Sequence, residues 1–106
     1  MSAEITAGSG NVFADLGLAG ADGLRARAEL LRIVSGILRE RRLTQAQTAE
    51  ILGTTQPVVS DIKRGKLHRF SPERLIGFLD ALGRDVKIVV RPRPMHRDAH
   101  LIVAAD

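Results

Sequence analysis

Residues 44–65, with the sequence TQAQTAEILGTTQPVVSDIKRG, constrain the fold more than any other part of this chain. Thr44 is followed three residues later by Gln47, which is the spacing of a capping box at the start of a helix. Gly53 falls where a left-handed residue commonly ends a helix. Thr55 is in turn a good cap for a second helix. The segment therefore predicts two short helices joined by a tight turn.

The spacing of small and apolar residues inside this segment is typical of a helix-turn-helix. A small residue, Ala49, lies where two steeply crossing helices would touch, while Val59 and Ile62 would face inward from the second helix. Pro57 falls in the first turn of that helix, where a missing N–H costs nothing. Thr48 stands where an apolar residue is usual, although its methyl group can still pack. An ordinary αα-hairpin in a helical bundle is the alternative.

Residues 43–66, LTQAQTAEILGTTQPVVSDIKRGK, resemble the DNA-binding core of the Cro/repressor-like (XRE) helix-turn-helix family. With the flanking runs NVFADLGL, RFSPERLIGFLDALGRDVKIVV and RPRP, residues 11–94 resemble HigA-type antitoxins, whose genes lie beside those of RelE-like toxins. The resemblance implies a mainly α fold: a Cro/repressor-like helix-turn-helix bundle of four to five helices, with a C-terminal β-strand or hairpin used for dimerisation.

The distribution of charge favours a polyanionic partner. The 106 residues include 16 Lys and Arg against 12 Asp and Glu, which gives a formal net charge of +4. Most of the excess lies in residues 24–83, the expected helical part. With three Phe, no Tyr and no Trp, the chain has few platforms for stacking single-stranded bases. Double-stranded DNA is therefore the favoured partner.

Several kinds of site are disfavoured by the composition. The chain has no Cys, which excludes disulfides and thiolate metal sites. His96 and His100 have no third ligand nearby, and Ser60 and Ser71 have no recognisable base, so we expect no metal site, no cofactor and no enzymatic activity. No run has the length of a membrane helix and the first ten residues do not resemble a signal peptide, so we expect a cytoplasmic protein.

We expect three parts in the chain: an N-terminal arm (1–23), partly flexible; a helix-turn-helix DNA-binding domain (24–83); and a C-terminal β dimerisation segment (84–106). The first ten residues are small and polar and are expected to fray. Residues 11–18 are apolar, and they either close the bundle or belong to a surface that meets a partner protein.

Two longer helices are expected on either side of the helix-turn-helix. Asp22 is the expected cap of the first, which runs to about Arg41 or Arg42 and has apolar residues at three- and four-residue steps. Ser71, followed by a proline and an acid, begins the last helix, and Gly83 ends it.

The C-terminal part switches to strand chemistry. Residues 85–90 are expected to form one strand and residues 101–105 a second. A hairpin is marginal alone and its open edge invites pairing, so we expect a sheet shared by two copies in a homodimer. A hairpin folded back on its own helices, or a disordered end, is the alternative. The side chains predicted at the dimer contact are Val86, Ile88, Val90, Leu101 and Val103.

The helix-turn-helix prediction assigns DNA-binding roles to individual residues. In this motif the second helix enters the major groove with its N-terminal end toward the bases. The predicted base contacts are Thr55, Gln56, Pro57, Ser60 and Asp61; the Gln56 amide suits adenine. The predicted phosphate contacts are Thr44, Gln45, Lys63, Arg64, Lys66 and Arg69. The basic run among these also fits a merely solvated face.

The favoured function is that of a sequence-specific DNA-binding antitoxin that represses its own operon and neutralises a RelE/HigB-like, mRNA-cleaving toxin. The alternatives are a stand-alone XRE-type repressor without a toxin partner and, in a different class, a helical adaptor that binds only protein. A single helix-turn-helix reads few base pairs, so we expect a homodimer on two half-sites about 34 Å apart.

Overall fold

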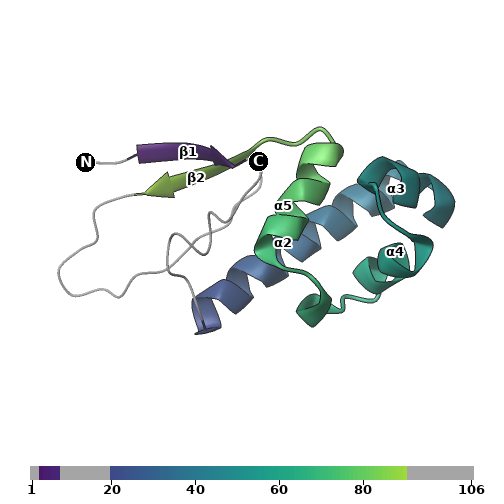
Figure 1. Cartoon of the computed structure of the whole chain (residues 1–106), viewed down its shortest axis with the longest axis horizontal. Helices are drawn as coiled ribbons and strands as arrows, with labels where there is room; N and C mark the ends of the chain where they lie inside the picture. The colour runs from purple at the N-terminus through teal and green to yellow at the C-terminus, as the bar shows by residue number, and fades with distance from the viewer. Residues whose placement is uncertain (1–2, 8–19, 91–106) are drawn as a thin grey trace.

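The computed structural model of the protein describes residues 3–7 and 20–90. Helices α3 and α4 lie at one end of the molecule and two paired strands lie at the other (Figure 1). The predicted mainly helical bundle with a C-terminal strand is confirmed. In chain order the described elements are β1 (Ala3–Ala7), α2 (Gly20–Arg41), α3 (Gln45–Leu52), α4 (Gln56–Lys63), the 3-10 turn η1 (Leu67–Arg69), α5 (Pro72–Ala81) and β2 (Val86–Val90).

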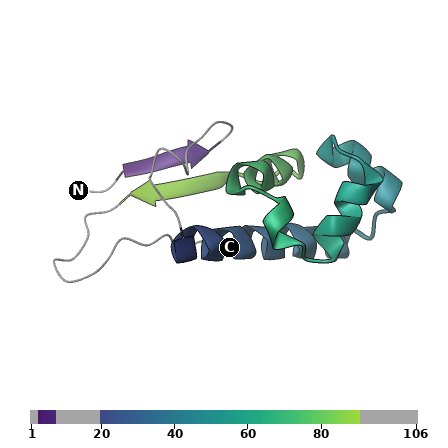
Figure 2. The same cartoon turned by 60° about the horizontal axis from the view of Figure 1, so that its bottom comes forward.

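The long helix α2 is the element on which the others pack, and Figure 2 shows it running along the helical part of the molecule. It begins at Gly20, two residues before its predicted cap Asp22, and ends at Arg41 as predicted. The Arg41 guanidinium donates to the carbonyl oxygen of Leu82 at 2.6 Å, which ties the end of α2 to the end of α5. The buried stripe of α2 consists of Ala26, Leu30, Leu31, Val34, Ile37 and Leu38.

One hydrophobic core joins the helices to β2. The rings of Phe70 and Phe78 meet edge to face with centroids 6.0 Å apart. The guanidinium carbon of Arg74 lies 5.5 Å from each centroid, so this cation covers the outer side of the aromatic pair. Because Phe70 precedes α5 and Phe78 lies within it, the pair fixes the approach of the chain to that helix.

The two strands differ from the prediction in how they pair. β1 pairs antiparallel with β2, with Ile5 opposite Ile88. The expectation that the first ten residues fray is therefore wrong for Ala3–Ala7, which form a strand. The predicted partner strand, residues 101–105, lies outside the described residues. β1 is ordered by hydrogen bonding to a segment distant in the sequence, and no local sequence pattern predicts that pairing.

None of the helices in the described residues is both long enough and apolar enough to cross a lipid bilayer. Within the same residues, His, Asp and Glu form no group of three or more that could hold a metal ion. His96 and His100 lie outside the described part of the chain.

Candidate DNA-binding surface

The start of α3 is held by the predicted capping box. The Thr44 hydroxyl accepts from the backbone N–H of Gln47 at 3.1 Å, and the Gln47 side-chain oxygen accepts from the backbone N–H of Thr44 at 3.0 Å. The N–H of Thr48 donates to the Thr44 carbonyl oxygen. No hydrogen bond within residues 3–7 and 20–90 engages the N–H groups of Gln45 and Ala46, so both remain free at the positive end of the helix.

The turn between α3 and α4 depends on Gly53, which has φ 67° and ψ 36°. Its N–H donates to the carbonyl oxygen of Glu50 at 3.2 Å, and the N–H of Thr54 donates to that of Ala49 at 2.9 Å. These two bonds form a Schellman motif, which ends α3 and redirects the chain into α4. Ala49 is buried, as its predicted place at the helix crossing requires.

Thr48 confirms that a polar residue is tolerated at a normally apolar position of the motif. Only 1% of its surface is exposed. Its hydroxyl donates to the carbonyl oxygen of Thr44 at 2.9 Å, so the buried polar group is satisfied within its own helix. The methyl group is then free to pack.

Helix α4 presents two faces of different character. Val59 and Ile62 are completely buried, as predicted. Thr55, Gln56 and Pro57 are exposed at the N-terminal end of the helix, with Ser60 half-buried one turn further on. Thr55 occupies the predicted cap position with extended backbone angles, but its side chain makes no cap hydrogen bond. The N-terminal end of α4 therefore carries polar side chains that the described fold leaves unused.

A basic turn follows α4 and folds back on it. Gly65 has φ 68°, and its N–H donates to the carbonyl oxygen of Ile62, while the N–H of Lys66 donates to that of Asp61. This repeats the Schellman geometry of the α3 end. Four of the predicted phosphate contacts lie here: Lys63 is the last residue of α4, Arg64 is its C-cap, and Lys66 and Arg69 follow Gly65.

Asp61 has partners within the protein. One carboxylate oxygen lies 3.4 Å from Lys66 Nζ and the other lies 3.3 Å from Arg69 Nη2. The Asp61 side chain is 13% exposed, so it offers little surface to a base. Sequence reasoning missed these ion pairs because the partners are five and eight residues away, beyond the spacing at which side chains on one helix meet.

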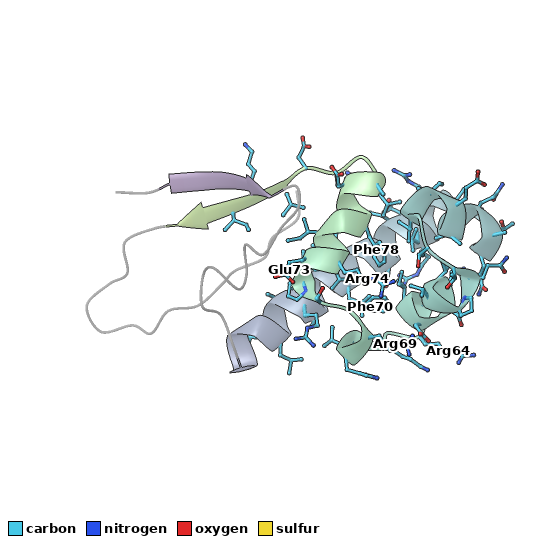
Figure 3. The ribbon with its side chains drawn as sticks, viewed as in Figure 1. Arg64, Arg69, Phe70, Glu73, Arg74 and Phe78 are labelled. Carbon is cyan, nitrogen blue, oxygen red and sulfur yellow. The ribbon has the colours of Figure 1, made fainter. Side chains whose placement is uncertain are left out.

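The four basic residues of this turn divide into two pairs. Lys66 and Arg69 share the Asp61 carboxylate, whereas Lys63 and Arg64 make no ion pair with any residue in the described ranges. Figure 3 shows Arg64 and Arg69 on the side of the molecule that holds α4, away from the strands. The predicted base and phosphate contacts are thus gathered around α3, α4 and the turn after α4.

Three of the residues predicted for dimerisation, Val86, Ile88 and Val90, lie on β2 at the other end of the molecule. Ile88 is 5% exposed and belongs to the core of its own chain, and Val86 packs against that core. Val90 forms the last residue of β2. Leu101 and Val103 lie outside the described residues. The Ile88 side chain is therefore used within the protomer.

These features define a helix-turn-helix protein of the Cro/repressor-like architecture. Residues 12–91 match the family described as helix-turn-helix domain. A solved structure described as an XRE-family transcriptional regulator matches with 37% sequence identity and a TM-score of 0.73, over 81% of this chain and 97% of that chain. None of the curated proteins compared matches the chain. The chain belongs to the XRE family of helix-turn-helix proteins.

Proposed function

We propose that the protein binds double-stranded DNA sequence-specifically, with the N-terminal end of α4 in the major groove, and represses its own operon. One observation carries the proposal: α4 buries Val59 and Ile62 while the polar residues at its N-terminal end stay exposed and unused. Membership of the XRE family and the likeness to a protein described as a transcriptional regulator support it.

In this proposal the residues at the N-terminal end of α4, from the cap Thr55 to Ser60 one turn further on, have chemical roles. The Gln56 amide donates to and accepts from one adenine, which presents a donor at N6 and an acceptor at N7. Pro57 offers an apolar surface to a thymine methyl group. The hydroxyls of Thr55 and Ser60 can donate or accept at neighbouring base edges.

Phosphate contacts would fix the register of α4 in the groove. The free N–H groups of Gln45 and Ala46 at the start of α3 suit a phosphate oxygen, because the helix dipole adds to their attraction. Lys63 and Arg64 lie at the C-terminal end of α4 and suit the DNA backbone there. Contacts on both sides of α4 would hold it between two stretches of phosphate.

We further propose that the protein acts as a homodimer on two half-sites. Within the described residues the sheet has two strands, β1 and β2, so each strand keeps one edge without a strand beside it. An open edge is a template for pairing with a second chain. Because Ile88 is buried in its own core, such a contact would rest on backbone hydrogen bonds and on the outward side chains.

The finer proposal is that the protein is an antitoxin that neutralises a RelE/HigB-like toxin. The resemblance of residues 11–94 to HigA-type antitoxins supports this proposal, because the resemblance extends to the flanks outside the helix-turn-helix. The second candidate is a stand-alone repressor without a toxin partner. The similar structure described as a transcriptional regulator is as compatible with this candidate as with an antitoxin that represses its own operon.

A gel-shift experiment with the promoter region upstream of the protein's own gene tests DNA binding. We expect a shift at low salt that weakens steeply as salt rises, because released counterions drive phosphate binding. A scrambled duplex of equal length is the control and should bind more weakly. Binding to neither duplex would exclude a DNA-binding role and favour the protein adaptor.

Co-expression with the neighbouring gene separates the two candidates. An antitoxin should restore growth that the neighbour inhibits and should co-purify with its product. A stand-alone repressor should do neither while still shifting its promoter. Absence of both rescue and co-purification would overturn the antitoxin proposal and leave the repressor.

A further inference from the structure

Asp61 places a negative charge inside the basic surface that the proposed function uses. It lies on α4 next to the buried Ile62, and its carboxylate meets two cations that follow the helix. The side chains of Lys66 and Arg69 are 44% and 54% exposed, so both can also reach solvent. A carboxylate and a phosphate present the same kind of acceptor to these cations, an anionic oxygen.

We propose that Asp61 competes with DNA phosphates for Lys66 and Arg69 and so limits sequence-independent binding. The inference rests on the proposed function, because it assumes that α4 and its following turn meet DNA. While the Asp61 carboxylate holds the two cations, a phosphate gains their contact only by displacing it. Lys63 and Arg64, which have no ion pair in the described residues, supply phosphate contacts without that competition.

The ion pairs of Asp61 with Lys66 and Arg69 are weak enough for a DNA phosphate to displace the carboxylate. The N···O distances of 3.4 and 3.3 Å are longer than those of well-formed charge-assisted hydrogen bonds, and both cations are about half exposed to solvent. A duplex can therefore displace Asp61, at a cost that weakens binding. The turn itself does not depend on the carboxylate, because the N–H groups of Gly65 and Lys66 hold it through backbone bonds.

This role differs from the base contact that sequence reasoning assigns to Asp61. A carboxylate that accepts from cytosine would strengthen binding to the operator and leave other duplexes unaffected. A carboxylate that competes with phosphate weakens binding to every duplex. The two roles predict opposite signs for the same substitution.

The test is Asp61→Asn, with binding to the promoter duplex and to a scrambled duplex measured over a range of salt. We expect both affinities to rise about three- to tenfold near 0.1 M salt, with a salt slope steeper by up to about 0.9 for each cation released. Glu50→Gln is the matched control, since it removes an exposed acid from α3 that has no ion pair in the described residues. It should change both affinities less.

A second comparison needs no change at Asp61. The double substitutions Lys63→Gln with Arg64→Gln, and Lys66→Gln with Arg69→Gln, each remove two positive charges. We expect the first pair to weaken binding and flatten the salt slope more than the second, because Asp61 already holds Lys66 and Arg69. Circular dichroism of every variant checks that it folds.

The outcomes separate the inference from the proposed function. Unchanged or weaker binding by Asp61→Asn, while the wild-type protein binds both duplexes, overturns the inference alone. An equal loss from the two double substitutions does so as well. Wild-type protein that binds neither duplex overturns the proposed function and the inference with it.

Discussion

The starts of α3 and α4 have related sequences and opposite uses. Each helix follows a threonine at its cap position and begins with a glutamine, Gln45 in α3 and Gln56 in α4. Thr44 is locked into a reciprocal capping box, whereas Thr55 has similar extended backbone angles and no side-chain cap bond. The same residue at the same helical position thus stabilises one helix and remains available to a ligand at the other.

The residue at the third position of each helix decides whether a side chain can bond back to the cap residue. In α3 the third residue is Gln47, whose side chain reaches back to the cap. In α4 the second residue is Pro57, which has no N–H to donate, and the third is Val58, which cannot reach back. The start of α4 therefore lacks the return bond that α3 has, and the Thr55 side chain makes no cap bond either.

The largest effect that would sharpen this comparison is on DNA binding. We expect Gln56→Ala to weaken binding to the promoter duplex by about 1–3 kcal/mol and to relax the preference at one base pair. Its folding stability should be unchanged, because no hydrogen bond of the described fold uses the Gln56 side chain. Gln47→Ala is the control, and it should lower stability through loss of the capping box. Equal promoter binding by Gln56→Ala and wild-type protein would remove Gln56 from the reading surface.

The ends of the two helices should behave alike, in contrast to their starts. Gly53→Ala and Gly65→Ala each force a side chain into the left-handed region, which we expect to lower the free energy of unfolding by about 1–2 kcal/mol. Denaturant unfolding measures this. No atom lies within 4 Å of an added Cβ at either glycine, so the cost is one of backbone conformation. A loss at one glycine only would show that the two turns are not equivalent.

A smaller effect is expected at the cap of α3. Thr44→Ala removes the acceptor for the Gln47 N–H and should lower stability by about 1 kcal/mol. Thermal or urea unfolding checks it, with Thr44→Ser as the control that keeps the hydroxyl. Unaltered stability of Thr44→Ala would mean that the box contributes nothing to folding.

The smallest effect on stability should come from the cap of α4. Thr55→Ala loses no side-chain hydrogen bond, so its free energy of unfolding should stay within about 0.5 kcal/mol of wild type. Promoter binding should weaken. If Thr55→Ala destabilises the protein as much as Thr44→Ala does, the two helix starts do not differ as described.

Local rules account for the parts of the fold that the sequence predicted well. The capping box of Thr44 and Gln47, the left-handed Gly53 and the Ser71 cap of α5 each depend on residues within a few positions of one another. The buried Val59 and Ile62 followed from the helical period. Such features need no knowledge of distant contacts.

The features that sequence reasoning missed depend on contacts between distant or folded-back segments. β1 is ordered by pairing with β2, which places Ile5 opposite Ile88 although all of the helices lie between them in the sequence. The Asp61 ion pairs exist because the turn at Gly65 brings Lys66 and Arg69 back to α4. The missing cap bond of Thr55 depends on the orientation of one side chain, which its residue type does not fix.

The most direct test of the proposed reading surface is an amide chemical-shift titration of the ¹⁵N-labelled protein with the promoter duplex. We predict the largest shifts at the backbone N–H groups of Gln56 and Val58 and at those of Gln45 and Ala46. The amides of β2, which lies at the other end of the molecule, should change little. The scrambled duplex should move the phosphate-facing amides of α3 more than those of α4. Shifts concentrated on the strands, with α4 unaffected, would contradict the account.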